Sequence, residues 1–244
     1  LRVLNKEGVN IVSLEDPVEY LIEGVNQSQV KPEIGYDFPQ GLRQILRQDP
    51  DIIMVGEVRD PETASLVIHS SLTGHIVLST LHTNNAIGAI PRLLDMGVDR
   101  YLISPSVSLA ISQRLVRRLC DKCKEKVEPV KEIMDLIERE IGQASLSVQK
   151  RASISLEQKG KGFFIFQSKG CKECGDSGFS GRIGIFEVLK MTQALQEIIL
   201  KDPSEQNIAK EAKRQGMTTM RQDGILKVLD GVTTIEEVLR ETEE

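Results

Sequence analysis

The sequence predicts an α/β fold built around a parallel sheet. Three short apolar runs rich in β-branched residues, at 9–14, 51–55 and 76–80, are separated by segments long enough to form helices. Runs of this kind are typical of buried strands, and their alternation with helices is typical of a parallel sheet. Ligands of such open sheets bind beyond the carboxyl ends of the strands. We therefore expect the residues that follow the three runs to meet at one edge.

Each apolar run is followed by residues that suit phosphate or a divalent cation. Glu15-Asp16 follows the first run, residues 56–60 (Gly-Glu-Val-Arg-Asp) follow the second, and residues 81–84 (Leu-His-Thr-Asn) follow the third. A single acidic residue after a buried strand is usually a loop residue or a helix N-cap. Three clusters together, one with the apolar-Gly-Glu pattern that resembles the acidic strand end of P-loop ATPases, indicate a site for Mg²⁺ and a triphosphate.

The four cysteines form two C-x-x-C pairs, Cys120 with Cys123 and Cys171 with Cys174. Two residues between cysteines let both thiolates bind one tetrahedral Zn²⁺, and two such pairs complete a closed structural site. Disulfides and redox chemistry are the alternatives. Disulfides are disfavoured because no export signal is visible, and a redox motif is hard to justify twice. We expect structural zinc rather than catalytic zinc, because no ligand position is left open for water.

Composition excludes some classes of protein. The chain has 244 residues, 40% of them hydrophobic and 27% charged, which is ordinary for a globular protein. No apolar stretch approaches the roughly 20 residues needed to span a bilayer. The net charge of -5 argues against a primary nucleic-acid binder, because such proteins carry a basic face. A short basic cluster at 114–118 is expected to be a solvated helix face or a protein contact.

Local signals predict further elements along the chain. Helices are expected at residues 61–73, 86–96, 103–119 and 129–141, and strands at 163–166 and 183–188. A polar stretch, 142–162, is expected to be a mobile insert. From about residue 190 the chain is expected to be helical, with helix starts at Asp202-Pro203-Ser204-Glu205, at Thr219 and at Thr233.

The segments around these strand ends resemble the type II secretion and type IV pilus ATPase family. Residues 15–20 resemble its aspartate box, residues 46–60 its Walker B region and residues 73–84 its histidine box. Residues 170–187 resemble its tetracysteine module, which separates the assembly and secretion ATPases from the retraction ATPases. The resemblance covers nearly the whole chain, from about Val3 to Val238.

The resemblance implies a RecA-like P-loop ATPase core that lacks its N-terminal part, over residues 1–118. It further implies a tetracysteine zinc module with a flexible insert at 119–186 and a C-terminal helical subdomain at 187–244. The implied protein is a cytoplasmic homo-hexamer that hydrolyses ATP with Mg²⁺. It is expected to contact the inner membrane through a platform protein of the pilus or secretion machine. A RecA-like motor that translocates nucleic acid is disfavoured by the acidic charge and by the zinc module.

Glu15 and Glu57 are the expected catalytic carboxylates. One polarises the attacking water and the other holds Mg²⁺, mostly through water. The sequence leaves the assignment open, although strand position favours Glu57 for the metal. The resemblance places five more residues near the nucleotide: Asp16, Arg59, His75, His82 and Arg182. The alternatives are structural: a turn for Asp16, an ion pair for Arg59, ordinary structural histidines, and bracing of the zinc module for Arg182.

One motif of the family does not occur in these residues. No segment reads G-x-x-x-x-G-K-[ST], the loop that holds the β- and γ-phosphates, and Gly160-Lys161-Gly162 lacks both its spacing and its hydroxyl. In the family this loop lies just upstream of a segment like residues 1–5. We therefore expect a C-terminal part of a longer protein that is inactive by itself. The alternative is a zinc-stapled protein-interaction module with a vestigial ATPase core.

Overall fold

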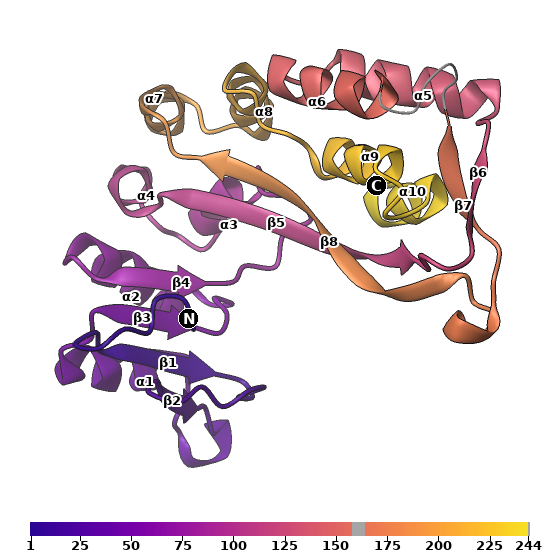
Figure 1. Ribbon diagram of the computed structural model, residues 1–244. Helices are drawn as coiled ribbons and strands as arrows, with labels where there is room; N and C mark the ends of the chain where they lie inside the picture. Colours follow the sequence, from indigo (N-terminus) through magenta and orange to yellow (C-terminus); the bar gives the residue numbers. More distant parts are fainter. Residues whose placement is uncertain (158–163, 244) are drawn as a thin grey trace. The chain divides into compact units, whose positions relative to one another are not determined.

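The computed structural model describes residues 1–157 and 164–243 and is shown in Figure 1. The chain forms two compact units, one from residues 1–109 and 191–208, the other from residues 110–190 and 209–244. The second unit thus combines the cysteine-bearing segment with the last helices. The predicted three-part division, at 118/119 and 186/187, stays a prediction. No helix among the described residues is long and apolar enough to cross a membrane.

A four-stranded parallel sheet in the order β2-β1-β3-β4 lies at the centre of the first unit. Its strands are β1 (Ile11–Glu15), β2 (Asn26–Gln29), β3 (Ile52–Val55) and β4 (Ile76–Ser79). Val12 pairs with Asn26 on one side and with Ile53 on the other, and Ile53 pairs with Val77. The parallel sheet and its three apolar strands are confirmed. Strand β2 is new, because four polar residues in a row give no strand signal.

Helices cover one face of this sheet. Leu14 and Val55 are buried there, against Leu42 of α1 (Phe38–Ile45) and residues of α2 (Pro61–Leu72). Helix α2 begins as predicted, since the Asp60 carboxylate accepts a hydrogen bond from the Thr63 N–H. The other face carries Glu15 and the exposed side chain of Leu78. It is on this polar, partly open face that the candidate site lies.

The first unit is completed by short helices, namely the 3₁₀ helices Pro32–Ile34 and Leu46–Gln48, then α3 (Ala89–Asp95), α4 (Arg100–Ser106) and α7 (Gln193–Lys201). Helix α7 packs on α4, where the Gln196 amide donates to the Ser104 carbonyl at 3.3 Å. Helix α8 (Glu205–Arg214) then carries the chain back to the second unit.

The second unit contains two strand pairs and a helical layer. Strand β5 (Leu109–Leu119) pairs with β8 (Phe179–Lys190), and β6 (Lys124–Val127) runs antiparallel to β7 (Ile165–Ser168). The helices are α5 (Lys131–Gly142), α6 (Leu146–Glu157), α9 (Met220–Leu229) and α10 (Ile235–Thr242). A core of Ile137, Ile165, Ile225 and Val238 joins these helices to β7. A 3₁₀ helix, Lys172–Cys174, precedes β8.

The helix predicted over 103–119 is present only up to Ser106 and is wrong beyond it. Helix α4 ends at Ser106, and β5 begins at Leu109. In β5 the buried Val116 packs with Ile185 of β8, so pairing with a distant strand outweighs local helix propensity. The basic cluster at 114–118 therefore lies on a strand and not on a helix face.

The mobile insert predicted over 142–162 is wrong for residues 146–157, which form helix α6. Val148 and Ala152 are buried in the core of the second unit, and their spacing of four places them on one helix face. Residue 142 is the last of α5, and residues 143–145 link it to α6. Residues 158–162 of this prediction, and the first residue of the predicted strand at 163, lie outside the described part of the chain.

The predicted starts of the C-terminal helices hold with small shifts. Thr219 and Gln222 form the predicted capping box of α9. Thr234 rather than Thr233 caps α10, because the Thr233 hydroxyl donates instead to the Arg117 carbonyl at 2.8 Å. Helix α8 begins at Glu205, so Pro203 precedes its first turn.

Candidate functional site

Glu15, Glu57 and His82 come together at the carboxyl edge of the parallel sheet. Glu15 is the last residue of β1, Glu57 follows β3 and His82 follows β4. A cavity of about 420 Å³ lies at this edge, and its lining includes Glu15, Asp16, Glu57 and Arg59. The structure therefore places both predicted catalytic carboxylates on one cavity.

The backbone around Glu57 is held between the neighbouring strands. The Gly56 N–H donates to the Leu14 carbonyl at 2.7 Å, and the Val58 N–H donates to the Thr80 carbonyl at 2.9 Å. The Thr80 hydroxyl donates to the Gly56 carbonyl at 2.7 Å. A Cβ atom at position 56 would lie 3.3 Å from the Glu15 Cα, so glycine permits this close approach of the two acidic segments.

The side chain of Glu57 is 11% exposed, and its carboxylate is held by two nitrogen donors. Its Oε2 lies 2.6 Å from Arg59 Nε and 2.8 Å from His82 Nε2. A carboxylate taken out of water needs such partners, because an unpaired buried charge is costly. The ion pair given as the structural alternative for Arg59 is thus present, and His82 shares the same oxygen. A role for Arg59 at a nucleotide stays a prediction.

The Glu15 carboxylate is held by side chains of β1 and β2. Its Oε1 accepts hydrogen bonds from Ser13 Oγ at 2.7 Å and from Gln27 Nε2 at 2.9 Å. Ser13 is fully buried, two residues earlier on the same face of β1. The sequence analysis did not identify Ser13 or Gln27. Ser13 could have been found from the sequence, because side chains two positions apart on a strand lie on the same face as each other. Gln27 could not, because nothing in the sequence indicates that β2 lies beside Glu15.

The remaining predicted residues are dispersed. Asp16 is exposed and lines the same cavity. His75 lies at the amino end of β4, where its Nδ1 is 2.9 Å from the Ser70 carbonyl, so the structure does not bring it to His82. Arg182 is an exposed residue of β8, in the second unit. Roles for these residues at a nucleotide remain predictions.

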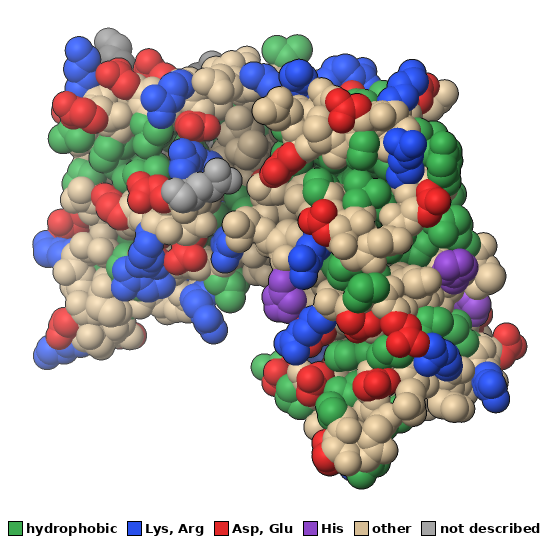
Figure 2. All heavy atoms as spheres, turned by 180° about the vertical axis from the view of Figure 1, so that it is seen from behind, with side chains coloured by type: hydrophobic (Ala, Val, Ile, Leu, Met, Phe, Trp, Pro, Cys, Tyr) green, Lys and Arg blue, Asp and Glu red, His purple; other side chains and the backbone are tan. Residues whose placement is uncertain are grey.

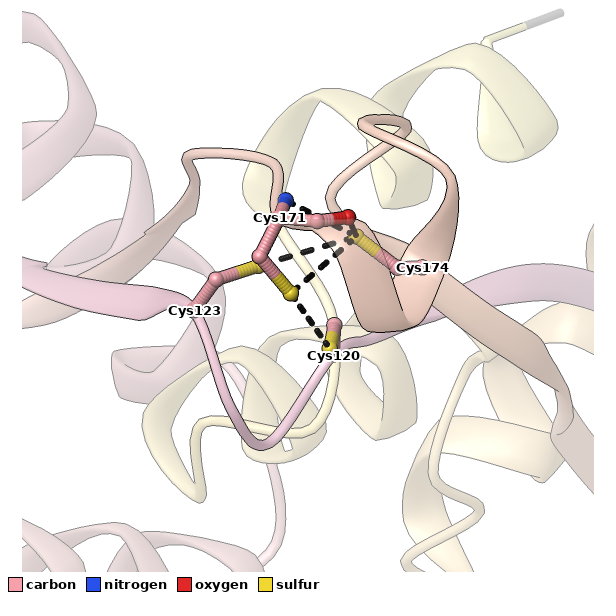
Figure 3. A group of neighbouring side chains, drawn as sticks. All are labelled: Cys120, Cys123, Cys171 and Cys174. Atoms are coloured by element: carbon pink, nitrogen blue, oxygen red, sulfur yellow. Dashed lines mark hydrogen bonds between the residues drawn. The ribbon is translucent and has the colours of Figure 1, made fainter.

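The four cysteines form a single cluster, which Figure 3 shows with the sulfur atoms turned toward one another. Cys120 Sγ lies 4.0 Å from Cys171 Sγ, and Cys174 Sγ lies 3.8 Å from Cys123 Sγ and 3.7 Å from Cys171 Sγ. All four sulfur atoms lie within 4.8 Å of one another. Zinc–sulfur bonds of about 2.3 Å in a tetrahedron set the sulfur atoms about 3.8 Å apart, so this donor set fits a zinc ion.

The fold brings the two cysteine pairs together through its strands. Cys123 immediately precedes β6 and Cys171 follows β7, and these strands run antiparallel with Lys124 opposite Ser168. The Cys120 N–H donates to the Gly178 carbonyl at 3.0 Å, next to the start of β8. Ends of both strand pairs therefore lie next to the cluster.

The cysteines differ in acidity. Burial raises the pKa of the Cys123 thiol to about 12. Burial also opposes ionisation of Cys174, but hydrogen bonds from the Cys171 and Gly178 N–H groups outweigh it and lower its pKa to about 6. The thiolate is the form that binds a metal, so the lowered pKa of Cys174 favours its metal-binding form.

Comparisons with known proteins agree with these observations. The family model described as "Type II/IV secretion system protein" matches residues 1–240. "Type II secretion system ATPase E" of Vibrio cholerae is 43% identical over 244 residues, covering 100% of this chain and 45% of that protein. "Type IV pilus assembly ATPase PilB" of Myxococcus xanthus is 43% identical over 242 residues, covering 99% of this chain and 40% of that protein. The chain thus spans less than half the length of these relatives.

Solved structures share the fold. The pilus retraction motor PilT with bound ADP superposes with a TM-score of 0.65 at 24% identity, covering 99% of this chain and 55% of that one. The ATPase DotB of Legionella pneumophila superposes with a TM-score of 0.60 at 23% identity, covering 94% of this chain and 50% of that one. The mixed α/β fold with a parallel sheet is therefore confirmed.

Proposed function

Because the chain belongs to the type II/IV secretion system protein family, we propose that the full-length protein hydrolyses ATP to power the assembly of a pilus or pseudopilus. Its relatives include proteins named as a type II secretion ATPase and a type IV pilus assembly ATPase. The observation that carries the proposal is the meeting of Glu15 and Glu57 on one cavity at the carboxyl edge of the sheet.

Glu15 acts as the base in this proposal. Ser13 and Gln27 hold its Oε1, and its position on the cavity lets the carboxylate take a proton from the attacking water. Glu57 would hold the Mg²⁺ of the nucleotide, mostly through water. The ion supplies charge compensation to the phosphates when it is bound.

Arg59 and His82 hold the Glu57 carboxylate in place. Both donate to the same oxygen, and His82 is exposed enough to respond to a phosphate that enters the cavity. His82 is therefore the residue that we propose as the sensor of the γ-phosphate. Asp16 orients the pair of carboxylates from the next position in the chain.

The nucleotide needs a phosphate-binding loop that residues 1–244 do not contain. We propose that the full-length protein supplies it and completes a RecA-like core. The proposed assembly is a cytoplasmic homo-hexamer that contacts an inner-membrane platform protein. His75 and Arg182 then act at the nucleotide or at a subunit boundary, as the resemblance implies. The cysteine cluster holds one structural zinc ion that joins two distant segments.

A second candidate function is a protein-interaction module with a vestigial core. A cavity of about 580 Å³ in the second unit favours it, because Phe186 and Val188 line this cavity with exposed apolar side chains. A nucleic-acid motor has less support. Figure 2 shows Lys and Arg side chains interspersed with Asp and Glu on the face drawn, rather than gathered into one basic region.

Two preparations test the proposal. The full-length protein should release phosphate from ATP in a Mg²⁺-dependent reaction. The 244-residue chain should show no turnover and at best millimolar affinity in calorimetric titration with Mg-ATP, because its acidic residues repel a triphosphate without a compensating lysine or amide nest. No hydrolysis by the full-length protein would favour the interaction module, and micromolar binding by the 244-residue chain would mean that another loop holds the phosphates.

A further inference from the structure

We infer that Gln27 is a positioning residue that orients Glu15 for proton transfer and couples it to the loop at residues 16–25. This inference rests on the proposed function, in which Glu15 takes the proton of the attacking water. Gln27 belongs to β2, a strand that no sequence motif marks. Its side chain is half-buried between Glu15 and the loop that follows β1.

Both polar groups of the Gln27 side-chain amide form hydrogen bonds. Its Nε2 donates to Glu15 Oε1 at 2.9 Å and to the Tyr20 carbonyl at 3.0 Å, and its Oε1 accepts from the Ile22 N–H at 2.7 Å. The opposite orientation would set the amide oxygen against a carboxylate and the NH₂ group against an N–H. The network therefore requires the shape of glutamine, with a donor on one side and an acceptor on the other.

The two donors to Glu15 leave one of its oxygens available. Gln27 and Ser13 both bond Oε1, and among the described residues none donates to Oε2. A carboxylate held at one oxygen keeps a defined direction while the other oxygen accepts a proton. Such precision matters, because a misplacement of about 1 Å can cost about 10²-fold in rate.

The same amide ties the carboxylate to an exposed loop tip. The two backbone groups that Gln27 holds, the Tyr20 carbonyl and the Ile22 N–H, flank Leu21. Tyr20 is 77% exposed and Leu21 is 86% exposed. A displacement of residues 20–22 must therefore break the Gln27 bonds or move the amide that orients Glu15.

The test is Gln27→Glu in the full-length protein, compared with Asn26→Asp. Gln27→Glu keeps the size and the acceptor for Ile22 but sets a carboxylate against Glu15. Asn26→Asp makes the same amide-to-acid change one residue earlier, on the opposite face of the sheet. At pH about 7.5 we expect Gln27→Glu to lower kcat for Mg-ATP by about 10-fold to 100-fold with KM little changed, and Asn26→Asp to leave kcat unchanged.

The pH profile separates positioning from a structural role. As the pH falls toward about 5.5, the introduced acid becomes protonated and can donate again, so the rate of Gln27→Glu relative to the parent should recover. The other charged and titratable side chains that line the cavities beside Glu15 are the same in both proteins, so the ratio isolates position 27. They are Arg2, Asp16, Glu19, Tyr20, Glu57 and Arg59. An unchanged kcat, or a loss that does not recover at lower pH, would overturn the inference.

A second readout does not depend on activity. Titration of the Glu15 side-chain carboxyl by ¹³C NMR in the 244-residue chain should show a higher midpoint in Gln27→Glu than in the parent, because like charges disfavour ionisation. An unchanged midpoint would overturn the contact itself. A full-length protein without ATP hydrolysis would overturn the proposed function alone, since this titration still reports whether Gln27 holds Glu15.

Discussion

Glu57 Oε2 lies 2.8 Å from His82 Nε2, although 25 positions separate the two residues. The contact arises because β3 and β4 are neighbouring parallel strands whose carboxyl ends meet at one edge. Arg59 Nε lies 2.6 Å from the same oxygen. A carboxylate that meets a cation and an imidazole at one atom has its orientation determined before any nucleotide arrives.

We predict that His82→Ala lowers ATP hydrolysis by the full-length protein by about 10-fold or more, because loss of one donor loosens Glu57 at the site of chemistry. The matched control is His69→Ala. His69 is exposed on α2, and its Nδ1 contacts the Ser65 carbonyl of its own helix at 2.7 Å. The measurement is kcat for phosphate release. Equal losses in the two variants would show that His82 has no special role.

We predict that the chain binds about one zinc ion and that Cys123→Ser releases it and destabilises the second unit. Structural zinc contributes directly to folding, and the cluster joins segments that lie 51 positions apart. Metal analysis after purification without added zinc gives the stoichiometry, and thermal unfolding gives the stability. Lys172→Ala, inside the second C-x-x-C pair, removes no thiolate and should keep both the metal and the stability. A fully folded protein without metal would rule out a structural zinc site.

We predict that the stability of the second unit depends on pH through Glu237. Burial raises the pKa of this carboxyl, but Arg117 and Arg240 outweigh burial and lower it from 4.5 to about 2. Arg117 Nη2 lies 2.6 Å from its Oε1. A lowered pKa contributes stability that is complete above 4.5 and is lost as the pH falls toward 2. Glu237→Gln should therefore cost about 3 kcal/mol near neutral pH, and progressively less below pH about 4.5.

The control for this prediction is Glu236→Gln, the preceding and exposed residue on the same helix. It removes the same charge without breaking a buried pair, so its effect should stay below about 0.5 kcal/mol. Chemical denaturation at several pH values measures both variants. A pH-independent difference between the parent and Glu237→Gln would disprove the linkage.

The sequence predicted those parts of the fold that have local signals. The apolar strands β1, β3 and β4 and the start of helix α2 depend on nearby residues, and each was found where expected. The cysteine spacing likewise predicted a cluster that the fold completes. Strand β2 was not predicted, because its place at the sheet edge comes from pairing with β1 and not from its own composition.

The incorrect predictions for β5 and α6 also arise because these elements depend on contacts with distant parts of the chain. Strand β5 reads locally as a helix, but its structure follows from pairing with β8, a strand 60 or more positions away along the chain. Helix α6 reads as a polar insert because, among its described side chains, few apolar ones reach the core, namely Val148 and Ala152. At the candidate site, Glu15 and Glu57 lie at strand ends that the apolar runs mark in the sequence. Gln27 becomes visible only when the sheet brings β2 beside β1.

The central claim is that Glu15 and Glu57 carry ATP hydrolysis, and Glu15→Gln and Glu57→Gln in the full-length protein test it most directly. Each should cut the rate of phosphate release by at least about 10²-fold, the lower range for lost acid–base assistance, while the circular dichroism of the protein stays unchanged. Glu62→Gln, which alters only an exposed ion pair with Arg43, should keep the parent rate. Parent rates in Glu15→Gln or Glu57→Gln would contradict the account.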